Sequence, residues 1–534
     1  MKNRNVAAAW VAITLAVLCA SPGVAGEKGP ALDAGTLVVG TRAEPKTLNP
    51  IAITASEGHQ IAALIFQKLL EEQDDFMSFK PQLAREWFFS ADSLDVTFKL
   101  RDDAAWSDGA PVTASDVRFT WQVQTDTTVA WPSASIKARI RDVEVKDAKT
   151  VVFHFQERYL YQVMDANDGV ILPEHLLASV ARTGLKTAPF GRAPVGNGAY
   201  VLKRWESGQY LDFVKNPRYA GPAPRVERVL IKFVPDAVTL VSQLEAGEID
   251  LLESVQAADL AAIHEQRGDV KILDVPSRRM SFVAWNNARA PFDQRAVRRA
   301  LTMAIDRGAI IKNIWGGHAR ECTSPLVPLL WAFDPFIQPI PYDPKGARAE
   351  LAKLGFKDRD HDGVIDRDGK QFAFELLVND AQNRVDIATM IQAQLKKIGV
   401  KVHVRVMEYG AFIDRILAMD YDAAVVEWKV QTKVDLTQLF HSSAKRPEGY
   451  NFIGYSNPEV DRLIDRALAQ REMKTAKELW SDAQRAIYND QPYTFIAIPQ
   501  ELTAIDDRFC NVTPSPISIF AHLADWRIQP DCAP

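Results

Sequence analysis

The chain has 534 residues, of which 47% are apolar and 25% are charged, and its formal net charge is −5 at pH 7. This composition is that of an ordinary globular protein, and the length is sufficient for more than one hydrophobic core. The mildly acidic balance gives no support for nucleic-acid binding and provides no attraction to anionic membrane surfaces.

The N-terminus has the form of a secretory signal peptide. Lys2 and Arg4 precede an uncharged apolar run at residues 6–20, which is shorter than the ~20 residues that a membrane-spanning helix needs. Small residues follow, suited to cleavage after Ala25 or the next residue. We therefore predict a signal peptide at residues 1–25 and export to the periplasm, with an N-terminal anchor as the less favoured alternative.

The strongest local pattern lies at residues 96–122. Apolar and polar residues alternate from Val96 to Arg101, which predicts a half-buried strand. A Trp-Ser-Asp-Gly turn follows at residues 106–109, and Thr113 with Asp116 forms the sequence of a capping box. The segment is therefore predicted to be a strand, an aromatic turn and a capped helix.

Strands and helices alternate along the rest of the chain. Apolar periodicity predicts strands near 36–40, 150–155, 229–234, 282–286, 372–378, 400–406 and 423–426, and helices near 56–71, 237–246, 291–305, 387–398, 412–419 and from 459. Gly399 stands where a helix C-cap is expected. This order of elements predicts α/β lobes with mixed β-sheets.

The unit at residues 96–122 and the segment at residues 40–50 closely resemble the extracytoplasmic solute-binding proteins of family 5. These are the oligopeptide-, dipeptide- and nickel-type substrate-binding proteins of ABC importers. The resemblance runs over nearly the whole mature length. It implies a class II periplasmic-binding-protein fold, in which helices flank the mixed sheets, a hinge joins two lobes and an extra subdomain is inserted in the first lobe.

The same resemblance implies the domain boundaries. Lobe I is expected at residues 33–55, 191–283 and 499–534, and the inserted subdomain at residues 56–190. Lobe II is expected at residues 284–498.

By resemblance, the protein captures a small peptide or other polar solute in the inter-lobe cleft and delivers it to an ABC permease in the inner membrane. We expect a monomer that is not an enzyme and needs no catalytic cofactor. The chain lacks the HExxH, GxSxG and Rossmann glycine motifs. Two alternatives remain: an exported hydrolase that uses paired carboxylates on peptides or glycosides, and a periplasmic sensor or chaperone with the same fold.

Ligand contacts are expected where strands end at the cleft. The candidates are Thr54 and Glu57 on lobe I, and Trp285, Asn379, Arg384, Glu427, Trp428 and Gln431 on lobe II. Arg384 is the candidate anchor for a ligand carboxylate, because its planar fork can bind both oxygens. The alternative for Arg384 is a surface pair with Asp380 or Asp386.

Trp428 and Gln431 carry the most direct consequence of the resemblance. In peptide-binding relatives, an aspartate three residues after this tryptophan pairs with the ammonium group of the peptide. Here that position is Gln431, and a neutral side chain loses the charge-assisted bond. This favours a polar or amphipathic solute without an obligatory free amine. Trp428 is expected to form an apolar platform, with packing inside the lobe as the alternative.

An acidic segment resembles the first part of an EF-hand calcium loop. The candidate metal ligands are Asp358, Asp360, Asp362, Val364 and Asp366. The loop departs from the pattern at its twelfth position, where Gly369 replaces the bidentate glutamate. A structural calcium ion and a solvated acidic turn are both open interpretations.

Of the four cysteines, Cys19 lies in the predicted signal peptide. In an oxidising compartment, Cys510 and Cys532 are the candidates for a disulfide in the tail, which leaves Cys322 alone. Three free thiols are the alternative.

Overall fold

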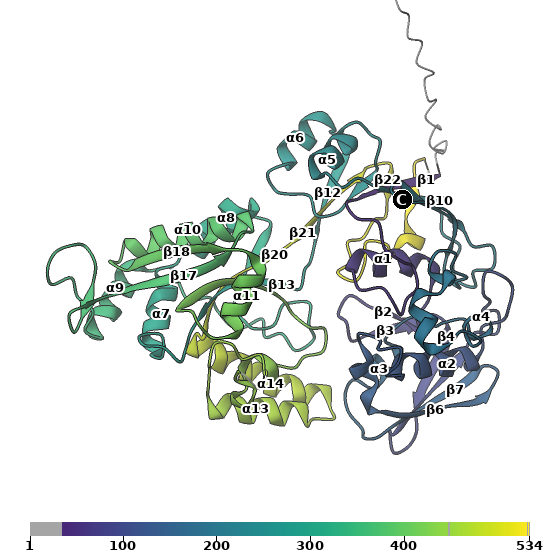
Figure 1. Cartoon of the computed structure of the whole chain (residues 1–534), viewed down its shortest axis with the longest axis horizontal. Coiled ribbons are helices and arrows are strands. Elements are labelled where there is room, and N and C mark those ends of the chain that lie inside the picture. The colour runs from purple at the N-terminus through teal and green to yellow at the C-terminus, as the bar shows by residue number, and fades with distance from the viewer. Residues whose placement is uncertain (1–34, 447–448, 531, 533–534) are drawn as a thin grey trace, which may run out of the picture. The chain divides into compact units, whose positions relative to one another are not determined.

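The computed structural model describes residues 35–446, 449–530 and 532, which form two lobes that each contain a large β-sheet (Figure 1). The predicted fold class is confirmed, since helices alternate with strands and both large sheets contain parallel and antiparallel pairs. The predicted signal peptide lies outside the described residues. None of the helices in the described part of the chain is both long and apolar enough to cross a membrane.

Lobe I contains a seven-stranded sheet in the order β12-β21-β11-β1-β10-β9-β8. Its strands are β1 (Thr36–Thr41), β8 (Tyr200–Glu206), β9 (Tyr210–Lys215), β10 (Arg228–Phe233), β11 (Leu251–Leu252), β12 (Val270–Val275) and β21 (Glu501–Asp506). The central strand β1 runs parallel to β10 and β11 and is buried on both faces. Leu37 and Val39 pack with α1 (Ser56–Ile65), whereas Val38 packs with α5 (Ala237–Glu245) and α6 (Leu260–Gln266).

The inserted subdomain is built on a four-stranded antiparallel sheet, β4-β5-β7-β6. Its elements are β2 (Leu70–Glu72), β3 (Phe79–Pro81), β4 (Ala84–Phe89), β5 (Asp95–Leu100), β6 (Ile140–Asp147), β7 (Thr150–Phe155), α2 (Ala114–Thr125), α3 (Gln162–Asn167) and α4 (Glu174–Leu177). The predicted capping box is present, because the Thr113 N–H donates to the Asp116 carboxylate at 2.7 Å and α2 begins at the next residue.

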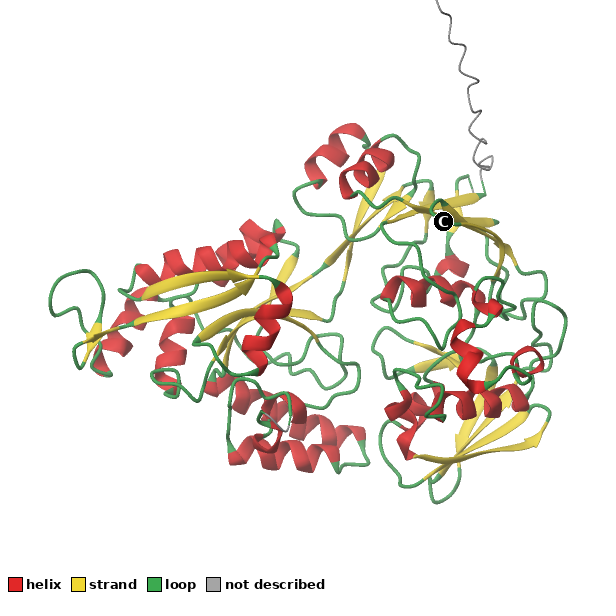
Figure 2. Ribbon diagram, viewed as in Figure 1, coloured by secondary structure: helices red, strands yellow, loops and turns green. Residues whose placement is uncertain are grey.

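Lobe II contains a six-stranded mixed sheet in the order β14-β20-β13-β19-β17-β18. Its strands are β13 (Arg279–Trp285), β14 (Ala319–Glu321), β17 (Ala373–Asn379), β18 (Lys401–Met407), β19 (Ala423–Lys429) and β20 (Tyr493–Pro499). Its helices are α7 (Arg295–Met303), α8 (Arg307–Trp315), α9 (Pro344–Lys353), α10 (Gln382–Lys396), α11 (Tyr409–Leu417), α12 (Thr437–Phe440), α13 (Pro458–Leu468) and α14 (Met473–Asp490). Helices cover both faces of this sheet (Figure 2).

Short elements complete the chain. They are the hairpins β15 (Asp366–Arg367) with β16 (Lys370–Gln371) and β22 (Phe509–Cys510) with β23 (Arg527–Ile528), and the 3-10 turns at Ala134–Arg139, Arg182–Thr187, Pro189–Gly191, Ser442–Ala444 and Leu523–Asp525.

The alternation of side chains along β13 explains where Trp285 lies. Phe282 faces the core layer that contains α13 and α14, while Val283 and Trp285 face the layer that contains α7 and α10. Trp285 is fully buried, stacks on Phe292 with ring centroids 5.2 Å apart, and donates through Nε1 to Thr494 Oγ1 at 3.0 Å. Trp285 is therefore a core residue, which corrects its assignment to the ligand site.

The chain crosses between the two large sheets at residues 276–278, which join β12 to β13, and at Gln500, which joins β20 to β21. The second crossing is close to the predicted boundary at residues 498/499. The first differs from the predicted boundary at residues 283/284, because β13 pairs with β19 over its whole length from Arg279. The apolar run of β13 gave no signal for the earlier crossing.

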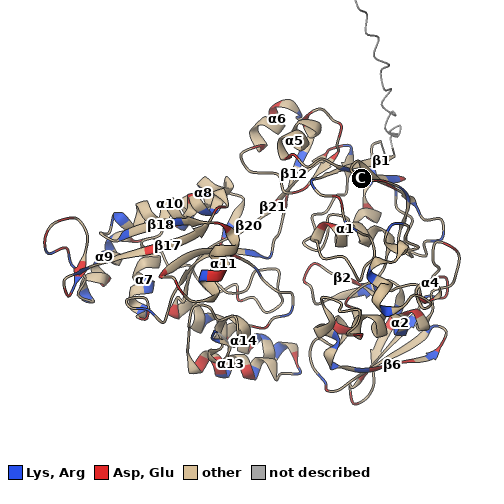
Figure 3. Ribbon diagram, in the orientation of Figure 1, with Lys and Arg blue, Asp and Glu red and all other residues tan. Residues whose placement is uncertain are grey.

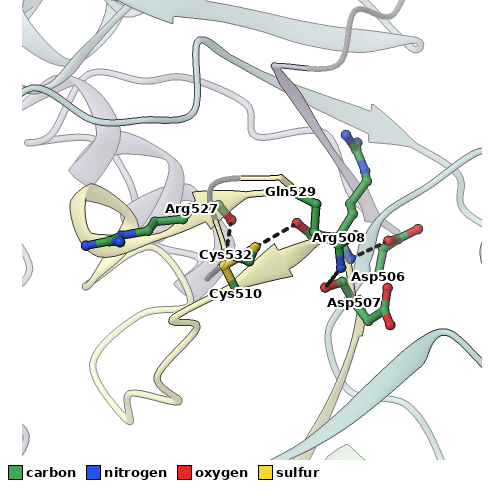
Figure 4. The surroundings of a disulfide bond; sticks show 7 residues. All are labelled: Asp506, Asp507, Arg508, Cys510, Arg527, Gln529 and Cys532. Carbon is green, nitrogen blue, oxygen red and sulfur yellow. Dashed lines mark hydrogen bonds between the residues drawn. A yellow bond between two sulfur atoms is a disulfide. The ribbon is translucent and has the colours of Figure 1, made fainter. Parts of the chain in front are cut away.

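The predicted disulfide joins Cys510 to Cys532, with the Cα atoms 5.8 Å apart (Figure 4). Cys510 belongs to the β22–β23 hairpin, and the nearby Arg508 binds the buried Asp250 carboxylate at 2.7 Å. The tail is therefore tied to the lobe I sheet. Cys322 is free and buried.

Candidate functional site

A cavity of about 1090 Å³ is lined by residues from both lobes and from the inserted subdomain. Its walls include the start of α1, the linker between β12 and β13, the loop after β19, and residues before and within α3. Aromatic side chains on the walls are Phe76, Phe79, Tyr159, Tyr161, Trp428, Tyr450 and Trp480. Apolar surface combined with a limited number of polar groups is typical of a small-molecule site.

The loop that follows β19 provides the lobe II wall. Trp428 is half-buried, packs against the lobe II core and also lines the cavity. Gln431 is exposed and lines the cavity. The two residues therefore offer the predicted apolar platform and neutral hydrogen-bonding group on one wall.

Two polar contacts join this loop to the inserted subdomain across the cavity. The Val434 N–H donates to Tyr161 Oη at 3.1 Å. Lys433 forms an ion pair with the buried Asp165, whose other oxygen accepts a hydrogen bond from the Tyr159 hydroxyl. Burial raises the pKa of the Asp165 carboxyl, against the opposing effect of Lys433.

A buried lysine fixes the segment that carries Asp165. The Lys137 ammonium donates to the carbonyl oxygens of Asp165 at 2.6 Å and Asp168 at 2.7 Å, at the end of α3. Burial lowers the pKa of Lys137 to about 8, although the carboxylates of Asp168 and Asp165 oppose this change. A cation at the carbonyl end of a helix is favourable, so Lys137 positions this wall of the cavity.

On lobe I, Glu57 and Glu253 line the cavity, whereas Thr54 is exposed and lies outside its lining. Burial raises the pKa of Glu253 to about 7, and the carboxylates of Glu501 and Glu57 act in the same direction. Glu253 is therefore a carboxyl group whose charged neighbours are other acids.

Three predicted lobe II residues bind one another and do not line the cavity. Arg384 donates to the side-chain oxygen of the buried Asn379 at 2.8 Å and lies 3.7 Å from the Glu427 carboxylate. Glu427 also pairs with Arg279 at 3.2 Å. The position of Arg384 does not support its predicted role as ligand anchor, because its guanidinium already has partners inside lobe II. Among the described residues, Arg384 also forms no ion pair with Asp380 or Asp386, its alternative predicted partners.

Sequence reasoning missed Arg278, Lys433, Asp165 and Tyr161, all of which line the cavity. Arg278, Lys433 and Tyr161 come from a linker and from loops, where hydrophobic periodicity carries no information, and Asp165 lies in the short helix α3. Lys433 could have been predicted, because it lies in the loop that follows Trp428 and contains Gln431, both of them candidate residues.

The acidic loop brings three of its predicted metal ligands together. One oxygen from each of Asp358, Asp360 and Asp362 lies within 4.8 Å of the others. The carboxylate of Asp366 instead accepts from Arg359 at 2.6 Å. The Val364 N–H donates to the Asp362 carboxylate at 2.8 Å, as in a tight turn. The loop is not part of the cavity lining.

Comparison with known proteins identifies the family. Residues 78–449, which are more than half of the chain, match the bacterial extracellular solute-binding proteins, family 5 (middle region). The chain belongs to this family. The name of the family describes extracellular solute binding, and this agrees with a cavity between the lobes.

Relatives of the protein in this family bind different solutes. The oligopeptide-binding protein AppA of Bacillus subtilis is 30% identical, with 98% of this chain and 99% of AppA covered. The structure of AppA with a nonapeptide matches with a TM-score of 0.70 over 92% of this chain and 98% of that chain. NikZ of Campylobacter jejuni, solved with Ni(L-His), is 25% identical with a TM-score of 0.73, over 93% of this chain and 100% of NikZ.

Proposed function

We propose that this family 5 protein is the periplasmic substrate-binding component of an ABC importer and captures a peptide or peptide-like solute in the cavity between its lobes. The observation that carries the proposal is the cavity of about 1090 Å³ with walls from both lobes. This volume slightly exceeds the ~300–1,000 Å³ of ordinary small-molecule pockets. An oligomeric solute such as a peptide fits it better than a single amino acid.

The chemistry of the walls supports a solute with both apolar and polar parts. Trp428 supplies apolar surface, and the exposed Gln431 can hydrogen-bond without carrying charge. Because no aspartate stands at position 431, a free ammonium group on the solute is not required at this point.

Delivery requires a partner and a change of conformation. We propose that the bound protein, as a monomer, is recognised by an inner-membrane permease after the lobes close on the solute. Closure is driven by the solute only if it binds the closed state better than the open one. The two chain crossings at residues 276–278 and Gln500 are the natural hinge. Residues 1–25 would direct export and be removed from the mature protein. Acidic and basic residues are interspersed along the described chain (Figure 3), which gives no preference for nucleic acid.

A hydrolase is not favoured, because the relatives are binding proteins rather than enzymes. We infer that the protein has no catalytic role. A sensor or chaperone role would keep the same cavity and differ in its partner.

We further propose a structural calcium ion in the acidic loop. Asp358, Asp360 and Asp362 supply hard oxygens at the spacing that calcium prefers. Asp358 Oδ1 is buried and has no hydrogen-bond partner among the described residues, which fits a site for a cation. If so, calcium raises the melting temperature through mass action on the folded state, and Asp360→Ala with Asp362→Ala abolishes the rise. If calcium does not change the melting temperature of the parent protein, the loop is a solvated acidic turn that binds no calcium.

The proposed function is tested by mass spectrometry of small molecules released on denaturing the exported, folded protein. We expect peptides or peptide-like compounds at a sub-stoichiometric to equimolar level. A captured metal chelate or sugar, with no peptide-like compound and no binding of added peptides by calorimetry, would contradict the proposed solute class.

A further inference from the structure

The basic side chains that line the cavity fall into two groups. One group has carboxylate partners: Lys68 with Glu72, Arg139 with Glu157, Arg279 with Glu427 and Glu501, and Lys433 with Asp165. In the other group, Arg278 and Lys429 have no carboxylate within 4.0 Å in the described ranges of the chain. These two cations are therefore available to a ligand.

Arg278 is held in place although it lacks an anionic partner. The Val430 N–H donates to the Arg278 carbonyl at 2.9 Å, and the Arg278 guanidinium donates back to the Val430 carbonyl at 2.7 Å. The guanidinium also lies over the ring of Phe76, 5.0 Å from its centroid. Arg278 is thus pre-organised between the linker and the loop after β19, which reduces the entropy lost when a ligand binds.

Lys429 is the second cation without a carboxylate partner, and it directly precedes Val430, to which Arg278 is bonded. It stands opposite Arg279 in the β13–β19 pairing and is exposed to the cavity. Burial lowers the pKa of Lys429, and the positive charge of Arg278 lowers it further. Burial likewise lowers the pKa of Arg278.

Nearby acids do not neutralise the pair. Glu501 and Glu57 act on Lys429, and Glu72 and Glu501 act on Arg278, yet the pKa of each cation stays below its ordinary value. Glu501 and Glu72 are already paired with Arg279 and Lys68. Both incompletely compensated cations line the same cavity, and each favours an anionic group of the solute near it.

We propose that Arg278 and Lys429 form an anion subsite that binds a carboxylate of the solute. This inference rests on the proposed function, under which the group is the C-terminal carboxylate of a peptide-like solute. Arg278 supplies a fork for two oxygens and Lys429 a compact charge. The subsite replaces Arg384, whose guanidinium is committed to Asn379 and Glu427.

The test uses two pools of mixed-sequence nonapeptides without charged side chains, identical except that one ends in a carboxylate and the other in a carboxamide. Isothermal titration calorimetry measures the dissociation constant of each pool for the full mature protein. The parent protein is expected to bind the carboxylate pool about tenfold or more tightly than the carboxamide pool. Lys429→Gln and Arg278→Gln are expected to reduce that preference to about twofold or less.

Control variants separate a loss of charge from a loss of fold. Arg118→Gln and Lys396→Gln make the same charge changes on exposed helical positions outside the cavity and should keep the preference. Arg278→Lys keeps the charge but loses the fork and should retain part of the preference. Lys429 is exposed, so Lys429→Gln remains informative even if Arg278→Gln fails to fold.

The outcomes distinguish this inference from the function on which it rests. Equal binding of the two pools by the parent protein would overturn the subsite while leaving peptide binding intact. A preference that survives in Lys429→Gln and in folded Arg278 variants would also overturn it. Binding of neither pool would contradict the proposed peptide function, and the subsite with it.

Discussion

At the scale of single residues, the partners of each charged group decide whether it can act on a solute. Arg384 and Arg278 are both arginines near the end of a lobe II strand, but their surroundings differ. Arg384 is bonded to Asn379 and lies near Glu427, whereas Arg278 is bonded to a backbone carbonyl. The sequence therefore shows which residues could bind a solute, and the contacts in the folded protein show which of them are free to do so.

Arg384→Ala is accordingly expected to weaken the fold and not the binding of solute. Removing the guanidinium leaves the buried Asn379 oxygen without a donor and Glu427 with one cation fewer, which costs about 1–3 kcal/mol of unfolding free energy. Urea unfolding measures this cost, and a solute titration should give a dissociation constant within about twofold of the parent value. A tenfold loss of affinity in the folded variant would return Arg384 to the binding site.

Glu253 predicts a pH dependence of stability. Its folded-state pKa is raised from 4.5 to about 7, so the folded protein binds more protons than the unfolded chain between these values. The contribution of Glu253 to the free energy of unfolding is therefore fully present below the unfolded-state pKa and is lost as the pH rises towards 7. Glu253→Gln removes this loss and should raise unfolding free energy by about 1–2 kcal/mol at pH 7.5, after allowance for solvent screening.

The measurement is the difference in melting temperature between Glu253→Gln and the parent at pH 5 and pH 7.5. The difference should be small at pH 5 and clearly positive at pH 7.5. Glu265→Gln, an exposed glutamate on α6 outside the cavity, controls for the change in net charge. A difference that does not change with pH would contradict the raised pKa.

At the scale of elements, the tail is held by a disulfide in addition to the core contacts of Phe509, Leu523 and Trp526. The disulfide closes a loop with a sequence separation of 22 residues around the β22–β23 hairpin. Cys510→Ser with Cys532→Ser is expected to lower unfolding free energy by about 2–4 kcal/mol, because the unfolded chain regains the freedom of that loop. Thermal unfolding of the exported protein with and without reductant gives the measurement.

The double variant provides its own control, since reductant should lower the melting temperature of the parent but leave that of the double variant unchanged. Equal melting temperatures of the parent and the double variant would show that the disulfide adds nothing to stability.

Elements with strong local signals were predictable, and those held by tertiary contacts were not. The alternation in β5 and the capping box at Thr113 and Asp116 depend on neighbours in the sequence, so the sequence shows them directly. The crossing at residues 276–278 could not be located, because charged and apolar residues are mixed on both sides of it, in β12 and at the start of β13, and the short linker has no period. The sequence also could not show that Trp285 lies in the core, because both faces of β13 are buried and its side chains do not alternate between apolar and polar.

The binding wall was predicted in part. Trp428 and Gln431 line the cavity as expected from the resemblance, and so does Glu57. Asp165 and Tyr161 come from the inserted subdomain, and their approach to Val434 and Lys433 depends on how distant segments pack. Contacts between residues so far apart in the sequence leave no local pattern.

At the scale of the whole molecule, the family membership and the cavity support the same account. Two lobes joined by two short crossings supply walls to one cavity, and a solute that contacts both walls favours the conformation in which they are close. The cross-cavity contacts of Lys433 and Tyr161 belong to the same walls and must adapt when a solute enters.

The most direct test of the account is a crystal structure of the protein saturated with the carboxylate-terminated nonapeptide pool. The account predicts electron density for an extended solute in the cavity, against Trp428 and with its terminal carboxylate at Arg278 and Lys429. Solute density at another site, or a cavity without solute in protein that calorimetry shows to be saturated, would contradict it.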